Sequence, residues 1–178
     1  MRRLTKAIAG GLLVFAVSCG GASAQVLASA EARLVEKNIT LPTPAAPVAN
    51  FVGTVQVGRL VFVSGHTSGP KWEPKGKVGQ ELTVQQGYDA ARQAGILMLA
   101  TLRAGLGSLD RVKRVVNVSA MVNSAEGFGD QPKVVNGVSD LMVEVFGEAI
   151  GKHTRTSVGV AGLPFNNPVE VEMIVEID

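Results

Sequence analysis

Two stretches of the chain place apolar residues at helical spacing. Between Thr83 and Gly105, small and apolar residues recur at alternating intervals of four and three, which predicts a long helix with one buried stripe. A second helix is predicted from Pro132 to Phe146. The residues expected on the buried sides are Val84, Tyr88, Ala91, Gly95, Met98, Leu102 and Gly105 in the first helix, and Val135, Val138, Met142 and Val145 in the second.

Shorter apolar runs predict strands around these helices. Residues 54–57 alternate at period 2, and the apolar run at 60–63 reads as a strand buried on both faces. Gly58 opens the two-residue loop between them, which suits a type II′ hairpin turn. Three further strands are predicted over residues 111–122, 155–160 and 169–177, with Val116, Val118, Ala120 and Val122 sharing one face of the first.

This order of elements predicts an α+β fold. A hairpin, a helix, a strand, a helix and two strands fit a two-layer sandwich, in which a mostly antiparallel sheet carries both helices on one face. The apolar strands favour burial of the other face against another chain. A short helix (28–38) and a proline-rich connector precede the sheet, so we divide the chain into a lead, 25–46, and one domain, 47–178; residues 68–79 read as an exposed loop.

The first 24 residues have the pattern of a secretory signal peptide. Three basic residues among the first six precede an apolar run over residues 7–17, and small residues follow. That run is well short of the ~20 residues of a membrane anchor, so we predict cleavage after Ala24 and a periplasmic or secreted protein. The runner-up is a lipoprotein acylated at Cys19, which would tether the protein to a membrane; Ala16 stands where that motif usually has Leu.

Removing this segment changes the charge. The whole chain of 178 residues has 17 basic and 15 acidic side chains, whereas the part after residue 24 has 14 basic and 15 acidic ones. With no basic stripe interleaved with aromatic residues, this balance argues against a nucleic-acid partner. The charged fraction of 18% is below the ~25% typical of globular chains, which fits surface buried in an oligomer.

Most catalytic motifs are absent from the sequence. His66 and His153 are far apart and the single cysteine lies in the export segment, so zinc-ligand spacing is missing. There is no G-x-S-x-G elbow, and the Gly105-Leu106-Gly107 segment ends a helix where a nucleotide-binding loop would begin one. We therefore predict no metal and no cofactor, and expect both histidines to be ordinary strand-end residues.

Arg155 is the strongest candidate for a ligand contact. By alternation, the apolar positions of its strand point inward and Arg155 projects to the opposite face with Ser157. An arginine beside small residues has room for a ligand, and its planar fork suits a carboxylate. Glu170 and Glu172 on the neighbouring strand could meet Arg155 or orient a water. The alternative is a surface salt bridge for Arg155 and a solvated face for the glutamates. On the strand that contains Arg155, the positions that we expect to point inward to the core are Thr156, Val158 and Val160.

Several segments resemble the RidA/YjgF family. The most specific is R-x-x-V-x-V-x-x-L-P at residues 155–164, followed by V-E-V-E at 169–172. Residues 61–65, 76–79 and 107–112 add to the resemblance, which spans about Pro47 to Asp178. It implies a chorismate-mutase-like fold assembled as a homotrimer with clefts between subunits. Archetypal members hydrolyse enamine and imine intermediates, such as 2-aminoacrylate, to 2-keto acids and ammonia without a cofactor.

The resemblance also implies roles for individual residues. Arg155 matches the arginine that binds the substrate carboxylate, and Glu170 matches the acid that positions the attacking water. Phe51 falls where these enzymes have a tyrosine, and Asn136 is the nearest candidate for the cleft asparagine. The residues that match cleft-lining positions are Ser64, Gly65 and Ser157.

These observations lead to three candidate functions. The first is an exported RidA-like homotrimer that binds a small carboxylate-bearing substrate and hydrolyses imines. The second is a non-catalytic binding or scaffold protein, which the missing tyrosine hydroxyl and the export segment favour. The third, ribonuclease activity, is disfavoured by the charge after residue 24.

Overall fold

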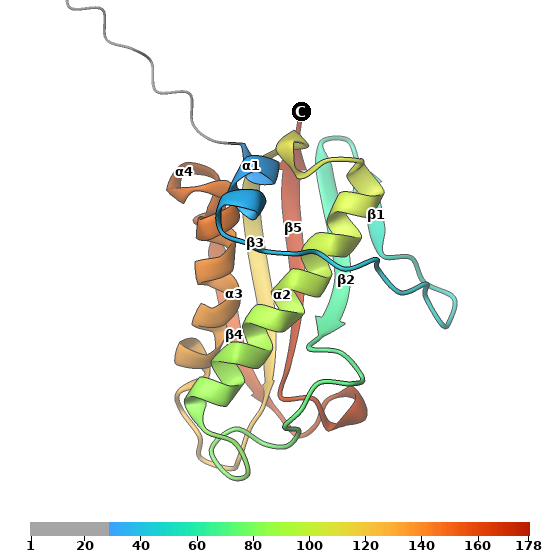
Figure 1. The fold of residues 1–178 in the computed structure, drawn as a ribbon. Helices are drawn as coiled ribbons and strands as arrows, with labels where there is room; N and C mark the ends of the chain where they lie inside the picture. The colour runs from blue at the N-terminus through green and yellow to red at the C-terminus, as the bar shows by residue number, and fades with distance from the viewer. Residues whose placement is uncertain (1–28) are drawn as a thin grey trace, which may run out of the picture.

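The computed structural model describes residues 29–178, which form one five-stranded sheet with helices on one face (Figure 1). The strands lie in the order β1-β2-β5-β3-β4; only the β3–β4 pair is parallel. The predicted α+β sandwich is confirmed. The elements are α1 (Ala30–Glu36), β1 (Thr54–Val57), β2 (Leu60–Thr67), α2 (Val84–Leu106), η1 (Leu109–Arg111), β3 (Val112–Asn123), α3 (Gln131–Phe146), α4 (Glu148–Gly151), β4 (Thr154–Val160), η2 (Pro164–Asn166) and β5 (Val169–Ile177).

Local sequence signals set the ends of the two main helices. Thr83 and Gln86 form a capping box at the start of α2, and Gly107 ends the helix with φ +84°. Pro132 lies in the first turn of α3, where its missing N–H costs nothing. The helices approach closely at Gly137, where a Cβ atom would collide with the carbonyl of Tyr88. The helix bounds predicted from periodicity are thus right to within one residue.

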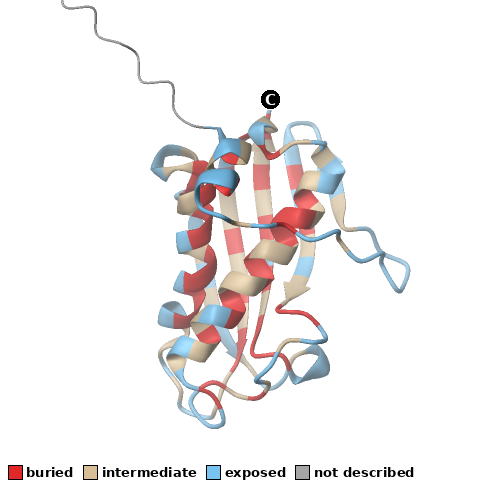
Figure 2. Ribbon diagram, viewed as in Figure 1, coloured by how far each residue is buried: buried red, intermediate tan, exposed pale blue. Residues whose placement is uncertain are grey.

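The core lies between α2, α3 and the sheet, as the burial colours of Figure 2 show. All four residues predicted to be buried in the second helix are fully buried, as are Ala91, Met98 and Leu102 in the first. Residues 68–79 depart from the expected exposed loop at Val78, which is fully buried and makes bridges to Leu82 and Ser124.

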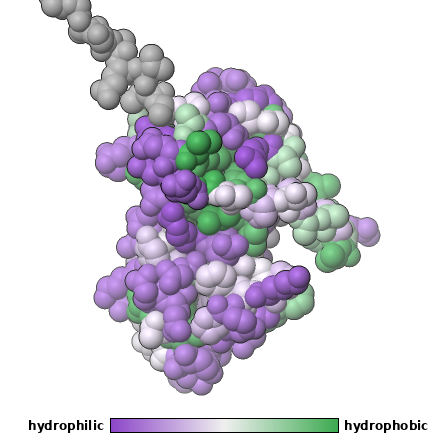
Figure 3. Space-filling model, in the orientation of Figure 1, coloured by the Kyte–Doolittle hydropathy of each residue, from purple (hydrophilic) through white to green (hydrophobic). Residues whose placement is uncertain are grey.

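The N-terminal lead is tied to the domain by reciprocal hydrogen bonds. The Glu31 carboxylate accepts a bond from the backbone N–H of Leu109, and the Glu31 backbone N–H donates to the Asp110 carboxylate. Arg103 on α2 forms an ion pair with Glu31, and Leu41 is buried farther along the lead. From there the chain crosses α2 and projects as a loop before β1 (Figure 1). This loop carries hydrophobic residues, and a second hydrophobic area lies near the middle of the same side, among mostly hydrophilic surface (Figure 3).

Two strand predictions need correction. In β2, Val61 and Val63 are buried under the helices, but Leu60 and Phe62 are exposed on the other face of the single protomer, so the strand is not buried on both faces. In β3, a register shift between Val115 and Asn117 places Val115 in the core in place of the expected Val116. The predicted hairpin turn is consistent with Gly58, which has φ +60°.

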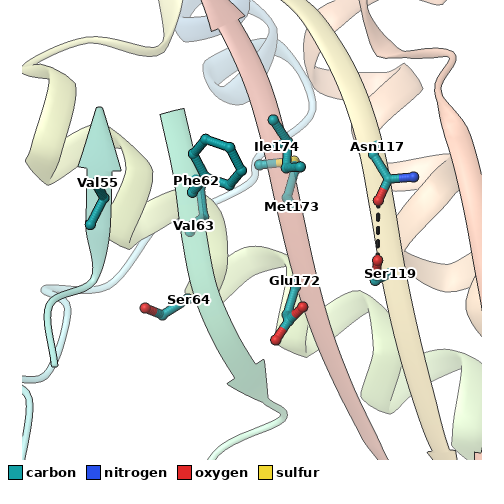
Figure 4. A pocket seen from close by; sticks show the side chains of 9 residues that line it. All are labelled: Val55, Phe62, Val63, Ser64, Asn117, Ser119, Glu172, Met173 and Ile174. Atoms are coloured by element: carbon teal, nitrogen blue, oxygen red, sulfur yellow. Dashed lines mark hydrogen bonds between the residues drawn. The ribbon is translucent and has the colours of Figure 1, made fainter. Parts of the chain in front are cut away.

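We call the sheet surface away from the helices the open face. Residues of β1, β2, β5 and β3 line a shallow depression of about 250 Å³ on it, where the apolar side chains of Val55, Phe62 and Ile174 lie next to acidic and hydroxyl groups (Figure 4). Exposed apolar side chains gathered on one face of a sheet are typical of an interaction surface. The apolar residues of the open face are Val55, Val57, Leu60, Phe62, Met121, Val158 and Ile174.

Candidate functional site

Arg155 lies on the helix face of β4, the edge strand next to α3. It pairs in register with Val118, and Ser157 pairs with Ala120; both partners are buried beneath the helices. The expected inward positions are therefore reversed: Val158 is 46% exposed on the open face. The apolar residues that alternate along β4 lie on the sheet surface that the helices leave uncovered. The prediction that they are buried within one protomer was therefore wrong.

The Arg155 guanidinium is held by two neutral oxygens of α3. Its Nη1 donates to Oδ1 of Asn136 at 2.9 Å and to Oγ of Ser139 at 3.1 Å. No carboxylate lies within ion-pair distance of Arg155 among residues 29–178. A salt bridge, the alternative role for Arg155, is thus not seen in the described part of the protomer. The structure places Asn136, the nearest candidate for the cleft asparagine, beside Arg155. We call Asn136, Ser139 and Arg155 the arginine half-site.

A β-bulge places the second group of predicted residues. The register of β2 against β5 shifts between Val63 and His66, so that Ser64 and Gly65 oppose the single residue Glu172. The absence of a side chain on Gly65 leaves room for the Glu170 carboxylate, because a Cβ atom there would collide with it and displace it. We call Ser64, Gly65 and Glu170 the acid half-site, which lies on the open face.

The environment of Glu170 favours its protonated form. Burial is the main reason that the pKa of the Glu170 carboxyl is raised above its ordinary value, and the negative charge of Glu172 raises it further. Glu170 has no ion-pair partner in the described part of the chain. A raised pKa makes a carboxyl group better suited to accept and return a proton, as a general acid or base must.

The loop before β1 closes the outer side of the acid half-site. Ser64 donates from its hydroxyl to the carbonyl of Val52 at 2.6 Å, and its backbone N–H donates to the carbonyl of Gly53 at 3.0 Å. Phe51, which precedes these residues, is 53% exposed. Its ring supplies apolar surface but no hydroxyl at this place.

The two half-sites do not meet within one protomer. We expected Glu170 or Glu172 to lie beside Arg155 on a neighbouring strand, but β3 separates β5 from β4. Two strand spacings amount to about 10 Å, and the two half-sites are on opposite faces of the sheet. The expectation failed because strands adjacent in sequence were taken as adjacent in space.

Sequence reasoning missed Ser139 of the arginine half-site and its neighbour His153. Ser139 lies one helical turn after Asn136 on the same side of α3, and His153 Nε2 is 3.0 Å from its Oγ. His153, expected to be an ordinary strand-end residue, lies just before β4 and shares a depression of about 340 Å³ with Ser139 and Arg155. The i, i+3 spacing on the helix and the i, i+2 spacing from His153 to Arg155 were the signals available.

Within residues 29–178, no cluster of three or more His, Cys, Asp or Glu side chains could hold a metal ion. The same part of the chain has no helix whose length and hydrophobicity would let it cross a membrane. The predicted signal segment and Cys19 lie outside the described residues.

Comparison with known proteins places these features in a family. A protein of Trypanosoma cruzi named TCP17 is 44% identical over 151 residues, which cover 83% of this chain and 93% of that protein. A 2-iminobutanoate/2-iminopropanoate deaminase of Dermatophagoides farinae is 31% identical over 140 residues, covering 79% of this chain and 95% of the relative.

A solved structure agrees with both matches. The Agrobacterium tumefaciens protein Atu1372, of unknown function, superposes with a TM-score of 0.77 at 39% identity, covering 84% of this chain and 92% of the other. The family model described as "YjgF/chorismate mutase-like, putative endoribonuclease" matches residues 31–177. The chain therefore belongs to this family, the RidA/YjgF family that its motifs resemble.

Proposed function

We propose that the protein is a homotrimer that binds a small 2-imino or 2-enamino carboxylate between subunits and hydrolyses it to a 2-keto acid and ammonia. The observation that carries the proposal is the state of Arg155. Its charge is held in place by Asn136 and Ser139, both neutral, so it is not balanced by a carboxylate of the described chain. A planar guanidinium positioned in this way suits a ligand carboxylate.

The acid half-site supplies the second requirement. Glu170 is partly buried, has a raised pKa and has no cation beside it in the described part of the protomer. In the proposed reaction, its carboxylate takes a proton from water as the water oxygen bonds to C2 of the substrate. The C=N π pair moves to the nitrogen, which takes that proton; the hydroxyl of the resulting carbinolamine then passes its proton to the nitrogen as the C–N bond breaks, so that C2 becomes a keto carbonyl and ammonia leaves. An enamine substrate enters this sequence as its imine tautomer, with one proton moved from nitrogen to C3. One water is consumed, and no electrons are transferred.

Assembly completes the proposed site. β4 is an edge strand, and the open face exposes Phe62 and Val158 to 42% and 46%. If the β4 edge of one protomer packs against the open face of the next, these apolar groups are buried and Arg155 can reach the partner's acid half-site. Closed cyclic assembly repeats this contact in every subunit. The Dermatophagoides relative is named as an imine deaminase, which supports the choice of substrate class.

The test is release of ammonia and pyruvate from enzymatically generated 2-aminoacrylate. We expect the wild-type protein to accelerate release over the spontaneous rate and Arg155→Ala to lose most of that acceleration. Arg92→Ala is the matched control, since Arg92 is an arginine that the structure does pair, with Glu144 at 2.6 Å. Equal rates for wild type and Arg155→Ala would sink the proposed role. Binding of pyruvate without any turnover would favour the scaffold function.

We further propose that this activity operates outside the cytoplasm. The support is the basic and apolar segment over residues 1–24. Mass spectrometry of protein recovered from the producing cells tests it: a mature chain beginning at Gln25 is expected, and an acylated Cys19 at the N-terminus would replace secretion with membrane attachment.

A further inference from the structure

A chain of hydrogen bonds runs from Arg155 through Ser139 to His153. His153 Nδ1 lies 2.6 Å from the carbonyl of Gly151, which can only accept, so Nδ1 carries the proton and donates. Nε2 of the neutral ring is then an acceptor for the Ser139 hydroxyl at 3.0 Å. With its proton committed to His153, Ser139 presents a lone pair to Nη1 of Arg155 at 3.1 Å. In this series of hydrogen bonds, each group donates to the next group farther from the guanidinium.

His153 is neutral in this arrangement. Burial is the main reason that its pKa lies below the ordinary value; the bond to Gly151 acts in the opposite direction, and the charge of Arg155 lowers the pKa further. The other charged groups lining the same depression are Lys152, next to it in the chain, and Asp140 on α3. Lys152 is paired with Glu148 at 2.8 Å, and Asp140 accepts a bond from Tyr88.

We propose that His153 is a further ligand-binding residue of the arginine half-site, and that Ser139 is the positioning residue that connects the two. In the unliganded protein, burial and the nearby charge of Arg155 keep the imidazole neutral. A carboxylate bound to Arg155 offsets that repulsion, so the ring takes up a proton and adds a second positive charge beside the anion. This inference rests on the proposed function, since it assigns a partner to the same carboxylate site.

The direction of the effect follows from linkage. If anion binding favours protonated His153, protonation must favour anion binding to the same extent. Affinity for a carboxylate then rises as the pH falls through the His153 titration and levels off once the ring is charged in both states. Asn136 keeps its bond to Arg155 at either pH, so the guanidinium stays in place while the charge around it changes.

The experiment measures the dissociation constant of pyruvate by calorimetry between pH 8 and pH 5. We expect wild-type affinity to increase about fivefold over this range, the low end of typical coupling between sites, and His153→Gln to lose most of this increase. His66→Gln is the matched control. His66 also has a buried ring bonded to a hydroxyl, that of Thr101 at 2.7 Å, and its substitution should leave the pH slope unchanged.

A second measurement needs no variant. The NMR titration of His153 in the wild-type protein should shift to higher pH when pyruvate is saturating. Equal pH slopes in wild type and His153→Gln, or a His153 titration that pyruvate does not move, would overturn the role of His153 while leaving Arg155 as the ligand site. Absence of pyruvate binding at every pH would overturn the proposed function itself, and this inference with it.

Discussion

The arginine half-site and the acid half-site are built by opposite means. On the helix face, the charge of Arg155 is held by neutral hydrogen-bond acceptors, so the group is fixed before any ligand arrives. On the open face, Glu170 is partly buried beside another acid, and its charge is disfavoured. In the proposed function, the first region binds the ligand carboxylate and the second moves a proton. Because β3 and the thickness of the sheet separate them, a single protomer has both abilities but cannot use them on one molecule.

Steady-state kinetics should separate the two half-sites. We expect Glu170→Gln to lower kcat by roughly 100-fold or more, the usual contribution of a general acid or base, with little change in KM. Arg155→Ala should raise KM as well, because it removes the carboxylate contact. The control is Glu172→Gln, which alters the neighbouring acid and should have a much smaller effect. A Glu170→Gln variant impaired only in KM would contradict the division of roles.

Mixing the two inactive variants tests whether the halves come from different subunits. Arg155→Ala and Glu170→Gln are unfolded together in equal amounts and refolded into mixed oligomers. A site between two subunits is intact only when one subunit supplies an unaltered Arg155 and the next an unaltered Glu170. Each condition is met in about half of the cases, so about a quarter of wild-type activity should return for a closed ring. If one protomer supplied both residues to the same site, mixing would restore nothing.

The smallest expected effect concerns stability. The pKa of Glu170 is raised in the folded protein, so the stability associated with its protonated form is present at low pH and is lost as the pH rises through the folded-state pKa. Glu170→Gln cannot ionise and should therefore melt at a slightly higher temperature than wild type at pH 8, with the difference shrinking towards pH 4. A thermal melt at the two pH values is sufficient. A difference that grew on acidification would place Glu170 in an environment that favours its charge.

The sequence was informative about elements and much less so about their arrangement. Periodicity located α2 and α3 because their buried stripes are long and their ends carry clear signals, such as the capping box at Thr83 and the glycines at 107 and 147. The family motif brought out Arg155, and the structure places Asn136 within hydrogen-bond distance of it; their role in binding a ligand stays a prediction.

What sequence reasoning could not give was which face of the sheet each residue occupies. Val158 looks like a core residue by alternation, yet it lies on the open face because an apolar strand pattern does not say which chain covers it. The neighbour of β4 was also hidden, since pairing between strands far apart in sequence leaves no local trace. His153 and Ser139 were missed for the same reason: each is ordinary by itself, and only the folded chain brings them together.

The bulge at Ser64 and Gly65 has a further consequence. Before it, Phe62 faces outward while Val63 faces the helices; after it, His66 also faces the helices and contacts Thr101 on α2. The extra residue shifts the alternation of the strand by one position. Odd-numbered positions such as Val63 face the helices before the bulge, and the even-numbered His66 faces them after it. A regular strand of the same length would turn His66 outward, because alternation from Val63 places position 66 on the open face. The surroundings of Glu170, the proposed proton-transfer group, therefore depend on the number of residues in the neighbouring strand as well as on the identity of the acid.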